Sequence, residues 1–273
     1  MPRPQVMRHM LTGESGGLIT PKRVELAGGW YHALATDLPI EHVAVSLKTI
    51  DYLFPLYLYP DPSKKDLFSD LEAGEGKKPN LSPKLVVSLR AAYGEESTPE
   101  DIFHYVYAVL YAEIYREKYV EFLKIDFPRV PFTADFERFQ ALAALGKRLT
   151  DLHLLRSEEL DPPAARFQGE GDDRVARTQS HGFRYEPKEE RVYINKAQYF
   201  EPVSLALWEY QIGGYQVLAK WLKDRRERRL TLEEMKTYCR VVTAIQRTIG
   251  LQEEVDALYA EAETQIVEIT DGP

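Results

Sequence analysis

Short apolar runs separated by turn-forming residues fill the first 60 positions of the chain. Gly, Pro and Asp bound these runs, which is typical of short strands. The most apolar stretch, 52–59, contains Pro55, which indicates a sheet edge or a bulge because proline cannot donate a ladder hydrogen bond. Residues 1–60 are therefore predicted to be β-rich. The other runs lie at 17–20, 23–26, 31–35 and 42–47.

Helical spacing follows a polar segment at 61–80, which is predicted to be an exposed linker loop. Thr98-Pro99-Glu100-Asp101 has a capping residue, a first-turn proline and acidic residues, as expected where a helix begins. Apolar residues then recur every three or four positions from Tyr105 to Phe122, which predicts one long helix. On this face Tyr105, Tyr115 and Tyr119 are expected to pack in the core rather than to stack on bases.

The last third of the chain predicts a hairpin and a helical C-terminus. Residues 182–186 and 191–195 alternate in polarity around a turn, which predicts a β-hairpin. Thr231 and Glu234 have the spacing of a capping box and begin the last helical segment. The apolar stripe changes phase at Gly250, which predicts a kink or two helices.

Together these patterns predict an α+β fold with a β-rich N-terminal part, a helical middle, a β-hairpin and a helical C-terminus. The expected parts are 1–60 (β-rich), 61–80 (linker loop), 81–156 (helical, with a further helix over 135–155), 157–230 (hairpin and short helix) and 231–273 (C-terminal helices with an acidic tail).

Composition is that of a soluble globular protein, with 44% hydrophobic and 29% charged residues. No apolar stretch is long enough to cross a membrane, so no membrane partner is expected. The single cysteine, Cys239, excludes an internal disulfide framework and suits a reducing compartment. A cytoplasmic location is therefore expected.

The net charge of −8 argues against nucleic acid as a partner, but the charge is unevenly distributed. Residues 215–250 hold nine basic and four acidic side chains, whereas residues 251–271 hold seven acidic and no basic ones. Binding responds to the local field rather than to the total charge. A basic surface is thus compatible with an acidic chain.

Motifs for covalent chemistry are missing. The sequence lacks a phosphate-binding loop, a dinucleotide-binding loop, a hydrolase nucleophile elbow, zinc-ligand spacing and the Asn-Pro-Pro-Tyr type of motif of amino-methyltransferases. Neither a metal nor a cofactor is expected. Cys239 lies on an apolar helix stripe and is interpreted as a core thiol rather than a nucleophile.

One loose match to a catalytic signature is Asp61 followed by Glu75 and Lys77, which spells a metal-dependent nuclease pattern. That chemistry needs a rigid platform, usually strands. The Gly- and Glu-rich surroundings of Glu75 make a poor strand, so a solvated linker is the preferred interpretation.

Three blocks of the sequence resemble a known family, and the second and third of them are long. They are 6–11 with 52–60, then 107–131, then 191–200 with 208–225. These blocks resemble the C-terminal specificity domain of Type ISP restriction–modification enzymes, and the resemblance spans about residue 3 to 260. The resemblance implies that full-length members are single polypeptides in which a nuclease, an ATP-driven translocase, an adenine-N6 methyltransferase and a target-recognition domain follow one another. This chain matches only the last of these domains.

The resemblance implies recognition of a specific double-stranded DNA sequence. It implies methyltransferase, translocase and nuclease domains as partners, in cis or in trans, and no catalysis in this chain. Two alternatives stay open: a module that docks onto a methyltransferase with little DNA affinity of its own, and the metal-dependent nuclease described above.

A recognition domain needs cations for phosphates and planar polar groups for base edges. The predicted hairpin supplies one candidate group, with a solvated hairpin as the alternative. A second group lies at the end of the predicted short helix and beyond it. The alternative interpretation is that these cations serve only to balance the negative end of the helix dipole. A third lies in an early loop before Trp30, itself interpreted as a core residue rather than a groove contact. The candidates are Arg184, Lys188, Arg191, Asn195 and Lys196; Lys223, Arg225, Arg226, Arg228 and Arg229; and Lys22 and Arg23.

Overall fold

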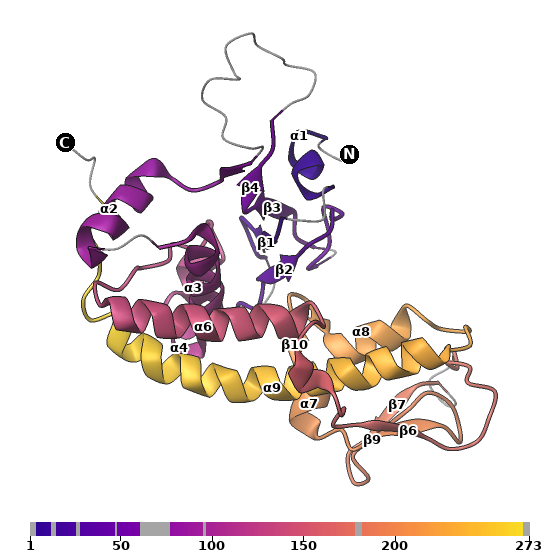
Figure 1. The fold of residues 1–273 in the computed structure, drawn as a ribbon. Coiled ribbons are helices and arrows are strands. Elements are labelled where there is room, and N and C mark those ends of the chain that lie inside the picture. Colours follow the sequence, from indigo (N-terminus) through magenta and orange to yellow (C-terminus); the bar gives the residue numbers. More distant parts are fainter. Residues whose placement is uncertain are drawn as a thin grey trace. The chain divides into compact units, whose positions relative to one another are not determined.

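The computed structural model describes residues 4–11, 15–25, 28–46, 48–60, 77–94, 97–177 and 182–269 (Figure 1). The chain forms two compact units. Unit 1 comprises residues 1–150 and 254–273, and unit 2 comprises residues 151–253. Helices are interspersed with small antiparallel sheets, which confirms the α+β fold. In the described part of the chain, no helix combines the length and apolarity needed to cross a bilayer.

Unit 1 begins with a three-stranded antiparallel sheet of order β2-β1-β3, so Pro55 ends an edge strand as expected. A two-stranded ribbon, β4 with β5, follows and includes two residues of the predicted linker, whose positions 61–76 lie outside the described residues. The elements are α1 (Pro4–Met7), η1 (Arg8–Met10), β1 (Gly17–Pro21), β2 (Leu34–Thr36), β3 (Asp51–Pro55), β4 (Tyr57–Leu58) and β5 (Lys78–Pro79).

Two of the strands predicted near the N-terminus are wrong. The described residues of 23–26 and of 42–47 lie outside any strand. The second segment forms a loop that Asp51, at the start of β3, holds closed. The Asp51 carboxylate accepts the Val45 N–H at 2.6 Å, and the Asp51 N–H donates to the His42 carbonyl at 2.9 Å. A side-chain bond of this kind competes with a sheet ladder for the backbone.

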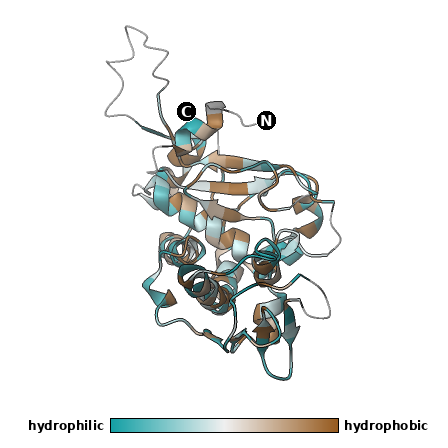
Figure 2. Ribbon diagram, turned by 90° about the vertical axis from the view of Figure 1, so that its right-hand side faces the viewer, coloured by the Kyte–Doolittle hydropathy of each residue, from teal (hydrophilic) through white to brown (hydrophobic). Residues whose placement is uncertain are grey.

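Helix α3 begins where its capping motif predicts. Thr98 and Asp101 form a complete capping box at the start of α3. Figure 2 shows apolar and polar residues alternating along these helices, as one buried face requires. The helices are α2 (Pro83–Tyr93), α3 (Pro99–Tyr111), α4 (Glu113–Lys118), α5 (Val120–Leu123) and α6 (Phe136–His153).

The single long helix predicted from Tyr105 to Phe122 is wrong, because the helix is interrupted at Ala112, whose backbone is extended (ψ 121°). Nε of Arg116 donates to the Leu110 carbonyl at 2.6 Å, and the Asp256 carboxylate accepts the Ile114 N–H at 3.2 Å. These side chains supply partners for backbone groups near the break.

Tyr105 and Tyr115 of the predicted tyrosine stripe are core, whereas Tyr119 is only half-buried. Tyr105 and Tyr115 are each 1% exposed, and their hydroxyls donate to the main-chain carbonyls of Pro131 and Arg129. The hydroxyls are therefore satisfied while the rings fill the core.

Unit 2 is built on a four-stranded antiparallel sheet of order β6-β9-β8-β7, in which β7 and β8 are the predicted hairpin. One side of the sheet packs against helices: the Phe200 and Tyr238 rings lie 4.1 Å apart. The elements are η3 (Glu158–Leu160), β6 (Arg166–Gln168), β7 (Arg184–Glu186), β8 (Arg191–Tyr193), β9 (Tyr199–Glu201), α7 (Leu205–Glu209), β10 (Gln211–Ile212), β11 (Tyr215–Gln216), α8 (Val217–Lys223) and α9 (Leu232–Ala262).

Of the kink or two helices predicted at Gly250, the two helices are wrong, because α9 runs unbroken through this residue. The two stripes differ in phase because the helix serves two cores. Val242 belongs to the core of unit 2, whereas the Tyr259 ring packs against Tyr115 in unit 1 at 5.8 Å. Gly250 itself is exposed, so its cost of about 1 kcal/mol is a matter of helix propensity alone.

Candidate nucleic-acid interface

The two basic segments predicted in unit 2 meet through a third segment, residues 172–177, which sequence reasoning missed. This segment lies between the β8–β9 turn and the loop that joins α8 to α9. The hydrogen bonds that hold it are Ala176 N to Ile194 O (2.9 Å), Asn195 Nδ2 to Arg174 O (3.2 Å), Val175 N to Arg228 O (3.0 Å), Glu227 N to Val175 O (2.7 Å) and Leu230 N to Asp173 O (2.8 Å).

This arrangement gathers cations from three parts of the chain at one end of unit 2. We call them the basic rim. On its hairpin side, Nη1 of Arg184 donates to the Asn195 carbonyl at 3.4 Å, and the Arg226 guanidinium lies 5.3 Å from the centre of the Phe183 ring. The basic rim consists of Arg174, Arg177, Arg184, Lys196, Arg226, Arg228 and Arg229.

A buried glutamine ties the rim together. Gln198 is 2% exposed, and its Oε1 accepts bonds from Asp173 N and Asn195 Nδ2, both at 2.9 Å. Its Nε2 donates to Oδ1 of Asp173 at 2.6 Å. Nearby Gly169 has φ +92°, and a Cβ there would lie 2.3 Å from the Ala197 carbonyl oxygen. This close backbone packing holds the start of segment 172–177 against the β8–β9 turn.

The predicted hairpin residues differ in how free their side chains are. Arg184, Lys188 and Lys196 are exposed. Arg191 is held between carboxylates, at 2.7 Å from Glu201 and 2.9 Å from Glu189.

Asn195 serves the turn. Its Nδ2 donates to Arg174 O and Gln198 Oε1, and its Oδ1 accepts from the N–H groups of Ala197 and Gln198. These four bonds occupy both donors and both acceptor positions of the amide.

Glu234 forms ion pairs with two of the five cations in the second predicted cluster. Its carboxylate lies 3.2 Å from both Arg225 and Arg228, and the Thr231 backbone N–H, followed by the charges of Arg228 and Arg225, lowers the pKa of Glu234. The Arg225 guanidinium also stacks on Trp221 at 3.6 Å. Arg225 is thus held within the fold.

The other cations of this cluster are more available. Lys223, Arg226 and Arg229 are exposed, and no described carboxylate lies within ion-pair distance of any of them.

The early-loop candidates belong to unit 1. Lys22 lies 3.8 Å from the Asp126 carboxylate, and Arg23 is exposed. Trp30 is 1% exposed, which confirms it as a core residue.

The nuclease alternative rests largely on positions outside the described residues, since Asp61 and Glu75 both lie there. The Lys77 ammonium lies 4.2 Å from the centre of the Tyr57 ring. Among the residues that the structure describes, no group of three or more His, Cys, Asp and Glu could hold a metal ion. Cys239 is a core thiol as predicted, and burial raises its pKa to about 11.

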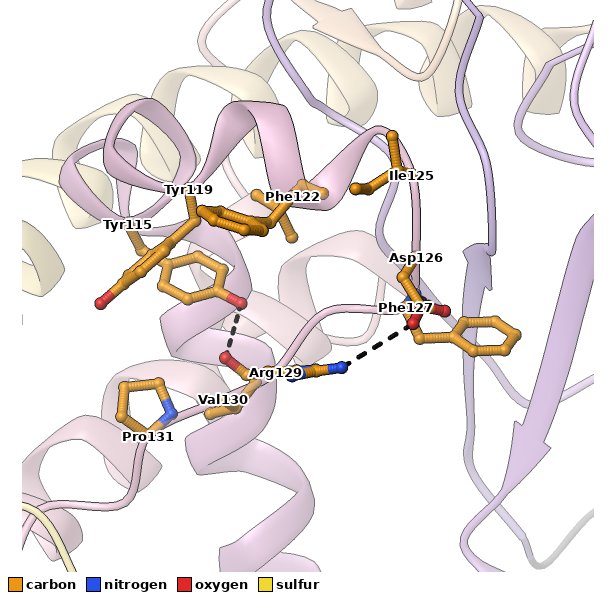
Figure 3. Close-up of a pocket in the computed structure, with 10 residues that line it drawn as sticks. Tyr115, Tyr119, Phe122, Ile125, Asp126, Phe127, Arg129, Val130 and Pro131 are labelled. Carbon is orange, nitrogen blue, oxygen red and sulfur yellow. Dashed lines mark hydrogen bonds and ion pairs between the residues drawn. The ribbon is translucent and has the colours of Figure 1, made fainter.

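An apolar cavity of about 530 Å³ lies in unit 1 (Figure 3). Aromatic and aliphatic side chains dominate its lining, and the Tyr115 hydroxyl points to the Arg129 carbonyl. Arg129 and Asp126 pair with each other at 4.0 Å. A phosphate would find one paired cation here, so this cavity is a poorer nucleic-acid site than the basic rim. Its lining consists of Tyr115, Tyr119, Phe122, Leu123, Ile125, Asp126, Phe127, Arg129, Val130 and Pro131.

The chain is similar to proteins of one known family. A family model described as the Type ISP C-terminal specificity domain matches residues 1–254. No curated protein matches the chain.

Solved structures that share the fold include three complexes with DNA or a DNA mimic. The ATP-dependent Type ISP restriction-modification enzyme LlaBIII bound to DNA is 18% identical, with a TM-score of 0.64 over 94% of this chain and 16% of that one. A nuclease-deletion mutant of the Type ISP enzyme LlaGI in complex with a DNA substrate mimic is 17% identical, with a TM-score of 0.60 over 88% of this chain and 18% of that one. The DrdV–DNA complex is 22% identical, with a TM-score of 0.62 over 97% of this chain and 26% of that one. This chain therefore spans about a sixth to a quarter of their length.

Proposed function

Because the chain belongs to the Type ISP C-terminal specificity domain family, we propose that it recognises a specific double-stranded DNA sequence for a restriction–modification system. The basic rim is the observation that carries this proposal, because it places exposed guanidinium groups from three chain segments at one end of unit 2. The three solved structures described above support it, since each contains DNA or a DNA mimic.

Within the rim, we assign the phosphate contacts to cations on loops and turns, such as Lys196, Arg226 and Arg229. Such cations fix the register of a protein on the duplex without reading sequence. Lys188 and Lys223 extend the same role, while Arg191, Arg225 and Asn195 shape the surface through their internal bonds. Lys22 and Arg23 are proposed as further backbone contacts from unit 1.

This chain then selects the target while other domains perform the chemistry. An adenine-N6 methyltransferase, a translocase and a nuclease, in the same polypeptide or in separate ones, are its proposed partners. The buried thiol of Cys239 and the chain's lack of catalytic motifs support a non-catalytic role.

Selection from a randomised duplex library at low and moderate salt tests the proposal. We expect the retained DNA to share one short asymmetric motif, because specific complexes outcompete the nonspecific ones by orders of magnitude. Retention without a motif that vanishes with salt would reduce the function to nonspecific phosphate binding.

Removing two rim charges should change the salt dependence in a predictable way. In the double variant Arg226→Gln with Arg229→Gln, we expect the slope of log K against log salt to fall in magnitude by about two, at roughly 0.9 per lost phosphate contact. Fluorescence anisotropy of a labelled duplex across a salt series measures this slope. Lys48→Gln with Arg129→Gln removes the same charge from exposed positions in unit 1 and is the matched control. Equal slopes for both double variants would contradict the assignment of the rim.

A docking module with little DNA affinity of its own is the second candidate function. The acidic excess of residues 251–271 favours it. Part of this charge is balanced within unit 1: Glu254, Glu261 and Glu263 lie within 4 Å of Arg148, Arg138 and Lys118. Failure of the library to bind at either salt concentration would favour this second function.

A further inference from the structure

The outer face of the unit 2 sheet is polar and aromatic. In the strand register, Arg184 lies opposite Tyr193, and Tyr193 lies opposite Tyr199. The alternate residues, such as Val192 and Phe200, point into the core. The pleat therefore places the arginine and the tyrosines together on the side away from the core.

These side chains form a stacked ladder. The Arg184 guanidinium lies 4.1 Å from the centre of the Tyr193 ring, and that ring lies 5.0 Å from Tyr199. Arg191 then stacks on Tyr199 at 4.3 Å. The Tyr193 hydroxyl donates a hydrogen bond to the Glu189 carboxylate at 2.7 Å. This bond is the largest cause of the lowered pKa of Glu189. The Tyr193 ring is thus held at its hydroxyl end and on its face.

The two arginines of the ladder have different environments. Glu189 and Glu201 both form ion pairs with Arg191, so its charge is balanced inside the face. Arg184 is exposed, and within the described ranges no carboxylate lies at ion-pair distance from it. Among the described residues, its guanidinium donates from Nη1 to the Asn195 carbonyl, and this bond leaves other guanidinium N–H groups for a ligand.

A stacked guanidinium is well suited to reading a base edge. Reading a base requires a planar group whose orientation is fixed before binding. Phosphates can be met by flexible point charges such as lysine ammonium groups. Arginine is the side chain whose fork matches the O6 and N7 acceptors of guanine in the major groove.

We propose that Arg184 is a specificity-determining residue that reads a guanine edge in the major groove, with Tyr193 as its positioning residue. This assignment rests on the proposed function. It extends that function from phosphate contact at the rim to sequence readout on the adjoining sheet face.

The test is library selection with the full chain and its variant Arg184→Lys, which keeps the charge and loses the planar fork. We expect the variant to retain the salt slope and nonspecific affinity within about twofold. Its preference at one G·C position of the motif should fall roughly tenfold or more, while the other positions keep theirs. Tyr193→Leu, which removes the stacking ring, should weaken the preference at the same position.

Lys188→Gln provides the contrast, since an exposed turn lysine should lower the salt slope by about one and leave the motif intact. An unchanged motif in Arg184→Lys would overturn the assignment. So would a weaker Arg184→Lys complex with a smaller salt slope and every base preference intact, because Arg184 would then contact a phosphate. A wild-type chain that selects no motif would refute the proposed function itself and this assignment with it.

Discussion

Replacing Gln198 by leucine is expected to cost about 3 kcal/mol of folding free energy and to abolish selective DNA retention. The substitution keeps the volume but leaves the Asp173 N–H and the Asp173 carboxylate without these partners, and it removes one of the four hydrogen bonds of the Asn195 side-chain amide. Because buried polar groups without partners are costly, segment 172–177 should detach from the β8–β9 turn. The basic rim would then lose its central segment.

Urea unfolding followed by circular dichroism measures the first effect, and library selection measures the second. Gln168→Leu is the matched control, because Gln168 is an exposed glutamine in the same sheet. We expect that control to remain within about 0.5 kcal/mol of the wild type. If Gln198→Leu were as stable and as selective as Gln168→Leu, the proposed role of the buried amide would be wrong.

Replacing Gly146 by alanine is expected to destabilise unit 1 by about 3 kcal/mol, although alanine is the better helix former. In α6 an added Cβ at this position would lie 1.8 Å from the His104 carbonyl oxygen and 2.6 Å from its carbon. Both are main-chain atoms of α3 and cannot turn aside as a flexible side chain could. The helices would have to separate, which exposes core such as Tyr105 and Leu149.

Gly250→Ala separates this packing effect from helix propensity. Gly250 is also a helical glycine, but no heavy atom lies within 4 Å of its added Cβ. That variant should gain roughly 1 kcal/mol from propensity alone. Differential scanning calorimetry of both variants shows the contrast, and a Gly146→Ala chain that melts with or above the wild type would contradict the packing argument.

The basic rim reconciles a net charge of −8 with the DNA partner that we propose. Acidic residues near the C-terminus pair with cations of unit 1, whereas Arg226 and Arg229 in unit 2 have no described carboxylate at ion-pair distance. A ligand meets this local field over about one Debye length, roughly 8 Å at physiological salt. The total charge therefore says little about this end of unit 2.

The sequence by itself determined the features that depend on neighbouring residues. Thr98 with Asp101 and Thr231 with Glu234 mark helix starts, because a cap bonds to backbone groups three residues away. Helical spacing identified Tyr105 and Tyr115 as core, because it places residues three and four apart on one face. The hairpin followed in the same way from strand alternation.

Only the tertiary structure decided the features that need partners distant in the sequence. The break at Ala112 involves Asp256, which caps α4 from 142 positions away in the chain. The unbroken α9 depends on two separate cores that accept different stripes of one helix. The candidate site depends on such contacts most of all. Segment 172–177 joins the two basic clusters, and carboxylates balance Arg191 and Arg225 while leaving Arg184 available. Local patterns show which cations exist, but the ion pairs and hydrogen bonds of the folded chain decide which of them can meet a ligand.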